Sequence, residues 1–293
     1  AITNTSSFEF RKFLIDSEFE LNITSLVNNK TWIFDNVHPQ FTIILLCLNK
    51  SSESNGLKLF GPFHSMQEFK KSHNKTITRF NPSEIKNWNQ SLSFPLLPNQ
   101  NSSDLLKIFG ISPSLADHCE DGWIASPYTE MNATTHKHYV EFDNDKFREN
   151  FWKVYKGESY DLWQPDTGKY YGYADPGPVL EWLQSKRLKS YKQNTNNFYK
   201  NFDESFIKNP DTLNNFHPRI AFRLISRSTD SRTLRACLVP PKTFHVHSSQ
   251  LVNIFSKDKF DEAYLLGVLC SIPLDWYARR FVEINFTFNY FNS

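Results

Sequence analysis

The apolar run at residues 41–48, FTIILLCL, limits the folds open to this chain more than any other stretch. An uncharged strand rich in branched side chains is typical of a sheet covered on both faces, as in α/β proteins. Two strand-like segments, 21–27 and 31–34, precede it around a polar turn. We therefore expect residues 1–60 to form an α/β unit with this run as a buried strand.

The same run is far shorter than the roughly 20 residues that a membrane-spanning helix needs. The first residues, AITNTSS, lack the basic and apolar regions of a signal peptide. The cysteines are widely separated and form no CxxC pair; they are Cys47, Cys119, Cys237 and Cys270. These features predict a protein of the reducing cytoplasm with no membrane segment.

The rest of the chain divides by composition. Residues 61–119 contain Ser- and Asn-rich stretches and two short amphipathic segments, which predict a connector with short helices. From Trp123 onward Tyr, Trp, His and Arg become dense, and after residue 260 the pattern predicts two helices. We expect an α+β domain over 120–293.

Positive charge gathers in residues 217–244, although the formal net charge of the chain is only +2. Any affinity for nucleic acid must therefore come from local charge. The stretch reads as two strands around a polar turn, with basic side chains on one face and apolar side chains such as Ile220 and Phe222 on the other. On the return strand Leu234, Ala236 and Leu238 form the apolar side. The candidate DNA-binding cations are Arg219, Arg223, Arg227, Arg232, Arg235 and Lys242.

Two interpretations of this hairpin are open. Arginine carries a planar fork of donors that suits phosphate oxygens and the guanine edge. Alternatively, the hairpin is an ordinary sheet face whose arginines pair with acids from elsewhere in the chain. Arg223, central in the first strand, is the leading candidate for DNA contact and also a candidate for a structural ion pair.

A second group of donors lies in residues 127–142, and these side chains suit phosphate. They are Thr134, Thr135, His136, Lys137 and His138. A metal site at the two histidines is a competing idea, but the sequence offers no completing ligand pair nearby. Further aromatic side chains, which either stack on bases or belong to the core, are Trp163, Tyr170, Tyr171 and Tyr173.

Five blocks resemble, in order, the C-terminal part of type IIG restriction–modification enzymes and related adenine-specific DNA methyltransferases. The blocks are NPSEIKNWNQSLSFPLL (81–97), PYTEMNATTHKHYVEF (127–142), WKVYKGESYDLWQPDTGKYYGYADP (152–176), HPRIAFRLISRSTDSRTLRACLVPPKTF (217–244) and DEAYLLGVLCSIPLDWYARRFVEINFTF (261–288). The resemblance implies a target recognition domain over 120–293. It also implies that residues 1–60 are the terminal strands of a methyltransferase core.

The catalytic motifs of that family are missing from this sequence. It has no FxGxG-type turn for S-adenosylmethionine and no (N/D)PP(Y/F) tetrapeptide, because Asn209-Pro210-Asp211 and Asp175-Pro176-Gly177 both fail at the second proline. The nuclease triplets Glu68-Phe69-Lys70 and Glu84-Ile85-Lys86 lack a preceding Pro-Asp. The resemblance therefore implies that S-adenosylmethionine serves the parent enzyme, whose catalytic region lies upstream of residue 1.

The leading hypothesis is a non-catalytic module that binds double-stranded DNA and recognises its sequence. Its expected partner within the parent protein is the missing N-terminal catalytic region. The alternative is a scaffold remnant whose aromatic and basic surface meets another protein. Salt dependence separates the two, because phosphate binding weakens steeply with salt and an apolar interface does not.

Overall fold

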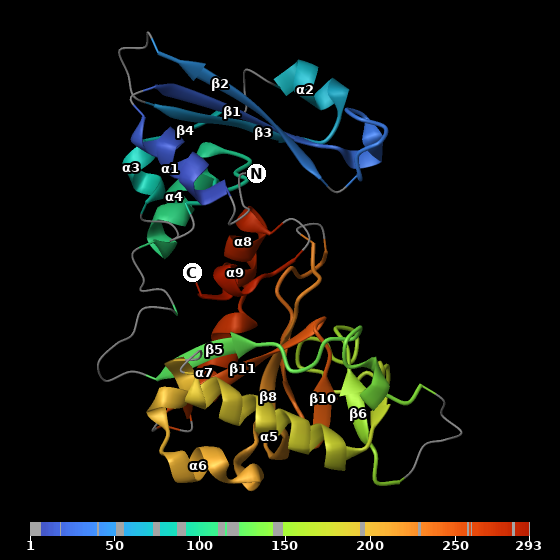
Figure 1. The fold of residues 1–293 in the computed structure, drawn as a ribbon. Coiled ribbons are helices and arrows are strands. Elements are labelled where there is room, and N and C mark those ends of the chain that lie inside the picture. The colour runs from blue at the N-terminus through green and yellow to red at the C-terminus, as the bar shows by residue number, and fades with distance from the viewer. Residues whose placement is uncertain are drawn as a thin grey trace.

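The computed structural model describes residues 7–17, 19–39, 41–50, 56–72, 77–86, 92–110, 115, 123–142, 149–193, 197–227, 230–256, 258, 260–282 and 285–292. Within these ranges the chain contains three sheets, arranged with their helices in an N-terminal and a C-terminal lobe (Figure 1). The fold is therefore of the mixed α and β kind that the sequence predicts. The predicted boundary near residue 120 falls outside the described residues and stays a prediction.

The N-terminal lobe is built on a four-stranded sheet with the order β2-β1-β3-β4. Its strands are β1 (Glu20–Val27), β2 (Thr42–Asn49), β3 (Leu57–Phe63) and β4 (Ile77–Phe80). Strand β1 pairs antiparallel with β2 and parallel with β3. Helices α1 (Phe8–Asp16), α3 (Pro82–Ile85) and α4 (Gln100–Phe109) lie below this sheet in Figure 1, and α2 (Met66–Ser72) follows β3. Leu21 and Ile23 of β1 enter the core that α1 and α4 help to form.

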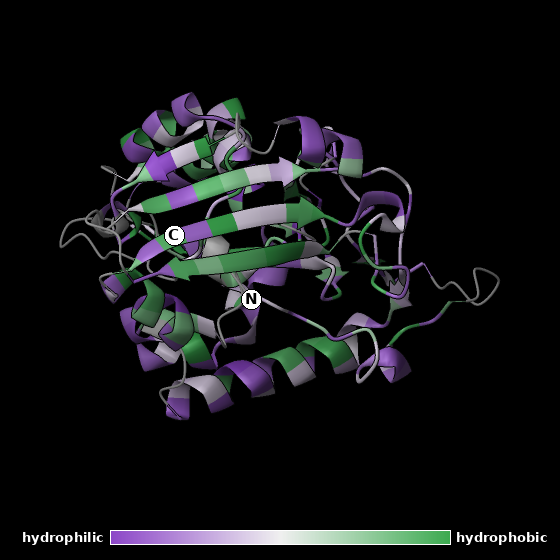
Figure 2. Cartoon of the chain, turned by 90° about the horizontal axis from the view of Figure 1, so that it is seen from above, coloured by the Kyte–Doolittle hydropathy of each residue, from purple (hydrophilic) through white to green (hydrophobic). Residues whose placement is uncertain are grey.

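Strand β2 is not the buried central strand that its sequence predicts. It lies at the edge of the sheet, and Leu45 and Leu48 are exposed by 51% and 44%. Figure 2 shows hydrophobic residues along almost the whole of this edge strand. The expectation failed because an apolar run shows that a strand can be buried but does not show what covers it. The segment 31–34 is also not a strand, since Asn29–Thr31 forms a 3₁₀ turn (η2).

The C-terminal lobe contains the other two sheets, ordered β10-β6-β7 and β5-β11-β8-β9. Their strands are β5 (Ile124–Tyr128), β6 (Trp152–Tyr155), β7 (Gly172–Ala174), β8 (Arg219–Arg223), β9 (Ala236–Val239), β10 (Thr243–His245) and β11 (Ser249–Phe255). The long helix α5 (Pro176–Lys192) begins at Asp175, whose carboxylate accepts the Gly177 N–H, with proline at the first helical position. Smaller elements are η3 (Lys137–Tyr139), η5 (Asn197–Asn201), α6 (Glu204–Lys208), η6 (Pro210–Thr212) and η7 (Asn214–Phe216).

The two helices expected after residue 260 are present as α7 (Phe260–Leu269) and α8 (Ile272–Phe281), followed by α9 (Phe288–Asn292). Ser271 caps α8 through the Leu274 N–H, and Pro273 occupies its first turn. Tyr277 and Phe281 of α8 belong to the core under the N-terminal sheet, while Ala278 belongs to the core under β8. Helix α8 therefore joins the two lobes through adjacent faces of one element, and its Leu274 packs against both cores.

Candidate nucleic-acid interface

Arg219, the first cation of the predicted basic face, is buried inside the C-terminal lobe. Its side chain is 3% exposed, and Nη1 lies 2.7 Å from Oε1 of Glu130, which is 2% exposed. Its Nη2 donates to the Thr243 carbonyl oxygen at 2.7 Å. The other oxygen of Glu130 accepts the His245 backbone N–H at 2.8 Å. This pair connects β8, β10 and the segment after β5.

Arg223 is half-buried and bonds to backbone carbonyls. Its Nε donates to the Gly157 oxygen at 2.5 Å, and Nη2 donates to the Tyr160 oxygen at 3.2 Å. A Cβ atom at Gly157 would lie 3.0 Å from Arg223 Cγ, so the two segments pack closely. Within the described residues Arg223 has no carboxylate partner, and it anchors the 157–160 segment instead of forming the ion pair considered for it.

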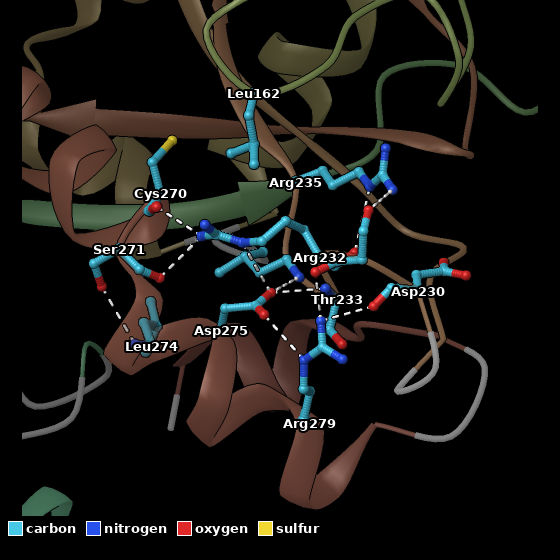
Figure 3. A network of polar contacts seen from close by, with 12 residues as sticks. Leu162, Asp230, Arg232, Thr233, Arg235, Cys270, Ser271, Leu274, Asp275 and Arg279 are labelled. Atoms are coloured by element: carbon cyan, nitrogen blue, oxygen red, sulfur yellow. Dashed lines mark hydrogen bonds and ion pairs between the residues drawn. The ribbon is translucent and has the colours of Figure 1, made fainter.

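Arg232 and Arg235 both reach acids that are remote in sequence. Arg235 Nη1 lies 2.8 Å from Oδ2 of Asp161. Arg232 Nε lies 3.5 Å from Oδ1 of Asp275, and its Nη2 donates to the Cys270 and Ser271 carbonyls (Figure 3). The alternative interpretation, arginines paired with acids from elsewhere, therefore describes these two side chains and Arg219.

Asp275 organises this part of the hairpin from helix α8. Asp275 is 5% exposed, and its carboxylate accepts the backbone N–H groups of Thr233 and Leu234 at 2.7 and 2.8 Å. Arg279, one turn further along α8, lies 3.0 Å from the second oxygen of Asp275 and also donates to the carbonyls of 230 and 231. Figure 3 shows these groups converging on one carboxylate.

Strands β8 and β9 form the antiparallel pair that the sequence predicts, with Ile220 opposite Leu238. The predicted division into one open basic face and one buried apolar face is wrong. Arg219 and Thr233 are buried on the supposedly open side, and Leu238 is 38% exposed on the supposedly buried side. The reason is that the 157–160 segment and β10 cover the arginine side of β8. Among the predicted cations of the hairpin, Arg227 and Lys242 are exposed.

The second predicted group forms a tight turn that continues into η3. Asn132 Oδ1 accepts the N–H groups of Thr134 and Thr135 at 2.8 and 3.1 Å. The Asn132 N–H in turn donates to His136 Nδ1 at 2.9 Å. The His136 ring lies 4.3 Å from the ring of Trp182 on α5. Burial, with the charge of Lys186 adding to it, lowers the pKa of His136, in keeping with a neutral ring that accepts a hydrogen bond.

The remaining side chains of this turn point away from the core. Thr134, Thr135, Lys137 and His138 are all exposed. Lys137 Nζ lies 5.6 Å from the centre of the Phe142 ring. Within the described ranges, none of these four side chains has a carboxylate partner, and no group of three His, Cys, Asp or Glu side chains could hold a metal ion. We call residues 134–138 the donor turn.

The tyrosines near the donor turn serve the core. Tyr171 donates to the Ala133 carbonyl at 3.1 Å and so fixes the turn from below. Tyr170 is half-buried and donates to the Asp166 carboxylate, while Tyr173 is half-buried beside it. Trp163 differs from them, because it is 66% exposed.

Sequence reasoning missed the partners that organise the site. Asn132 had a local signal, because Asn followed by small polar residues favours a side-chain-capped turn. The pairing of Glu130, Asp161 and Asp275 with the hairpin had none, since each meets its hairpin arginine across 43 residues or more of chain.

Comparison with known proteins gives likenesses to solved structures alone. No protein-family model matches the chain, and no curated protein matches it. A solved structure similar to this chain is that of the type IIG restriction endonuclease BpuSI, with a TM-score of 0.36 and 12% sequence identity. The match covers 94% of this chain and 36% of that enzyme, so the chain spans about a third of its length. No helix in the described ranges is both long and apolar enough to cross a membrane.

Proposed function

We propose that this chain is the DNA-recognition part of a cytoplasmic restriction–modification protein that methylates adenine. The support from sequence is the ordered resemblance of five blocks to that family. In this proposal S-adenosylmethionine and the catalytic residues belong to a region of the parent protein outside this chain. The chain itself contributes binding to double-stranded DNA.

The observation that carries the proposal is the donor turn. Hydroxyl, ammonium and imidazole groups at four nearby positions can all donate to phosphate oxygens. The backbone beneath them is already fixed by Asn132 and Tyr171. Binding through such a turn costs little ordering of the chain, which favours affinity.

The arginine hairpin has a different part in this proposal. Arg219, Arg223, Arg232 and Arg235 hold the lobe together through the contacts described above. Arg227 and Lys242 are exposed and, in addition to the donor turn, are candidates for phosphate contact.

A second candidate function is a contact with another protein, and the exposed leucines of β2 favour it. An edge strand offers unpaired backbone groups, and an apolar edge is a common site of protein association. This surface lies in the N-terminal lobe and is separate from the donor turn, so both functions are compatible.

Titration of a labelled duplex at about 50 and 200 mM salt tests the proposal. We expect binding that weakens steeply with salt, and a slope of log affinity against log salt whose magnitude is smaller by about one in Lys137→Ala. Lys208→Ala is the matched control, since Lys208 is an exposed lysine that pairs with Glu204 on α6. Salt-independent binding, or none, would contradict the proposal.

A further inference from the structure

Trp163 stands at the tip of a two-residue turn. Asp161 and Gln164 exchange both backbone hydrogen bonds, each at 3.0 Å, so that only Leu162 and Trp163 lie between them. The φ angle of Trp163 is 60°, in the left-handed region. Turns that need a positive φ at this position favour Gly or Asn, and a bulky residue there is an outlier. The chain therefore holds a large aromatic side chain in a backbone conformation that its type disfavours.

The turn is held firmly from below. Asp161 bonds to Arg235 at 2.8 Å through Oδ2 and accepts the Leu162 N–H through Oδ1 at 2.9 Å. Leu162 packs against the core beneath β8, and Figure 3 shows it above Arg235. Arg223 binds the Tyr160 carbonyl, just before the turn. The backbone N–H of Trp163 also donates a hydrogen bond to the Cys237 thiol. Burial raises the pKa of this thiol, and the hydrogen bond lowers it by a smaller amount. The backbone of the turn is thus fixed on several sides.

The ring itself is left open to solvent. In the described part of the chain no other ring stacks on Trp163, whereas Trp152 and Trp182 each contact neighbouring rings. Folding normally gains free energy by burying a side chain of this size. Trp163 thus combines a strained backbone, a firmly held turn and an exposed ring. Strained residues of this kind cluster at sites that bind a partner.

The proposed function supplies the class of that partner, a nucleic acid. Most cations of the neighbouring hairpin are already bound inside the protein, but Lys169, six residues beyond Trp163, is exposed and has no carboxylate partner among the described residues. An exposed aromatic ring in a segment that also carries an exposed cation suits a base attached to phosphate more than it suits an apolar protein surface. In an intact duplex both faces of a base are covered by its neighbours. A tryptophan can reach a base face only where the stack has opened.

We propose that Trp163 stacks on a DNA base that has left the duplex stack. This inference rests on the proposed function and names the form of DNA that the module takes. Aromatic wedges of this kind let a protein hold an opened base step, and the tip of a narrow rigid turn has the shape for it.

The test compares a fully paired duplex with one that carries a single mismatched, fluorescent 2-aminopurine. We expect the wild-type protein to bind the mismatched duplex more tightly and to quench the 2-aminopurine. Trp163→Ala should lose roughly 5- to 150-fold in affinity for the mismatched duplex. Trp163→Phe should retain part of it, and Tyr264→Ala, which removes another ring that is 66% exposed, should change nothing.

The outcomes separate the two proposals. If wild-type protein binds duplexes with a salt-dependent affinity and Trp163→Ala binds the mismatched duplex equally well, the stacking inference fails and the proposed function stands. If the same variant instead loses self-association, Trp163 serves a protein contact and the inference is overturned. If wild-type protein binds neither duplex, both fail. Trp163→Gly, which relieves the backbone strain, should melt at or above the wild-type temperature and serves as the folded control.

Discussion

At the scale of single residues, most of the positive charge in 217–244 is used inside the protein. The Arg219–Glu130 pair is the clearest case, since both side chains are almost fully buried and also hold backbone groups of other segments. A buried charge without its partner is very costly, whereas the intact pair is close to neutral for stability compared with apolar residues. These arginines therefore specify how the segments assemble.

Replacing only one member of the pair should destabilise the fold. We expect Arg219→Met to lower the free energy of unfolding by about 3–5 kcal/mol, because Glu130 is left buried and uncompensated. Urea unfolding monitored by tryptophan fluorescence measures the change. The double variant Arg219→Met/Glu130→Leu should recover much of the loss, and the exposed Arg227→Met should change stability by less than about 0.5 kcal/mol. Equal effects at Arg219 and Arg227 would contradict this assignment.

A buried histidine beside that pair predicts a pH dependence. Burial, with the positive charge of Arg219 adding to it, lowers the pKa of His245 well below its usual value. Above about pH 6.5 the His245 ring is neutral in the folded and the unfolded protein, so it does not change how the free energy of unfolding varies with pH. Below about pH 6.5 the ring takes up a proton in the unfolded protein alone. Stability should then fall by about 1.4 kcal/mol for each pH unit, until the folded pKa is reached. Urea unfolding between pH 7.5 and 5 should show this decline in wild type, and it should be reduced in His245→Gln. An unchanged slope in the variant would rule out His245 as its source.

At the scale of elements, helix α8 fixes the segment between β8 and β9. Four groups converge on Asp275: two backbone N–H groups and two arginines, one from the hairpin and one from α8 itself. The carboxylate thereby ties the hairpin to the helix that also enters the N-terminal core. The shape of this loop depends on an acid more than 40 residues away along the chain.

Removal of that carboxylate should loosen the loop. In Asp275→Ala the buried N–H groups of Thr233 and Leu234 lose their acceptor, which costs about 1–3 kcal/mol for each unsatisfied group. We expect the amide hydrogens of these two residues to exchange much faster, as measured by hydrogen–deuterium exchange with NMR. Asp104→Ala, at an exposed acid on α4, is the control. Full protection of both amides in Asp275→Ala would show that the loop does not depend on this carboxylate.

Local patterns in the sequence predicted elements better than they predicted what the elements pack against. Alternation in residues 217–244 correctly predicts β8 and β9, and the apolar stretch after 260 correctly predicts α7 and α8. The exposure of β2 and the burial of Arg219 could not be predicted, because both depend on segments that are distant in sequence. The donor turn was recognised by its residue types, while its fixed geometry comes from Asn132, Tyr171 and Trp182.

At the scale of the whole molecule, α8 makes the two lobes depend on each other. Phe281 is 2% exposed in the core under the N-terminal sheet, and Ala278 is 3% exposed in the core under β8. Arg280 adds a main-chain contact, because its backbone oxygen accepts the Leu96 N–H at 2.7 Å. The C-terminal lobe, which contains the donor turn, is therefore packed against the N-terminal lobe through α8.

Truncation within α8 should therefore affect both lobes. We expect Phe281→Ala to cost about 3–5 kcal/mol and to speed amide exchange in β1 as well as in β8. Hydrogen exchange with mass spectrometry measures both strands in one experiment. Loss of protection in β1 alone would show that the lobes unfold independently.

The central claim is that the donor turn, and not the buried arginines of the hairpin, meets DNA. Acetylation of lysines, read by mass spectrometry with and without saturating duplex DNA, tests it at the level of the residue. The account predicts that DNA protects Lys137 from acetylation and leaves the paired, exposed Lys208 as reactive as before. Equal reactivity of Lys137 in the free and DNA-bound protein would contradict it.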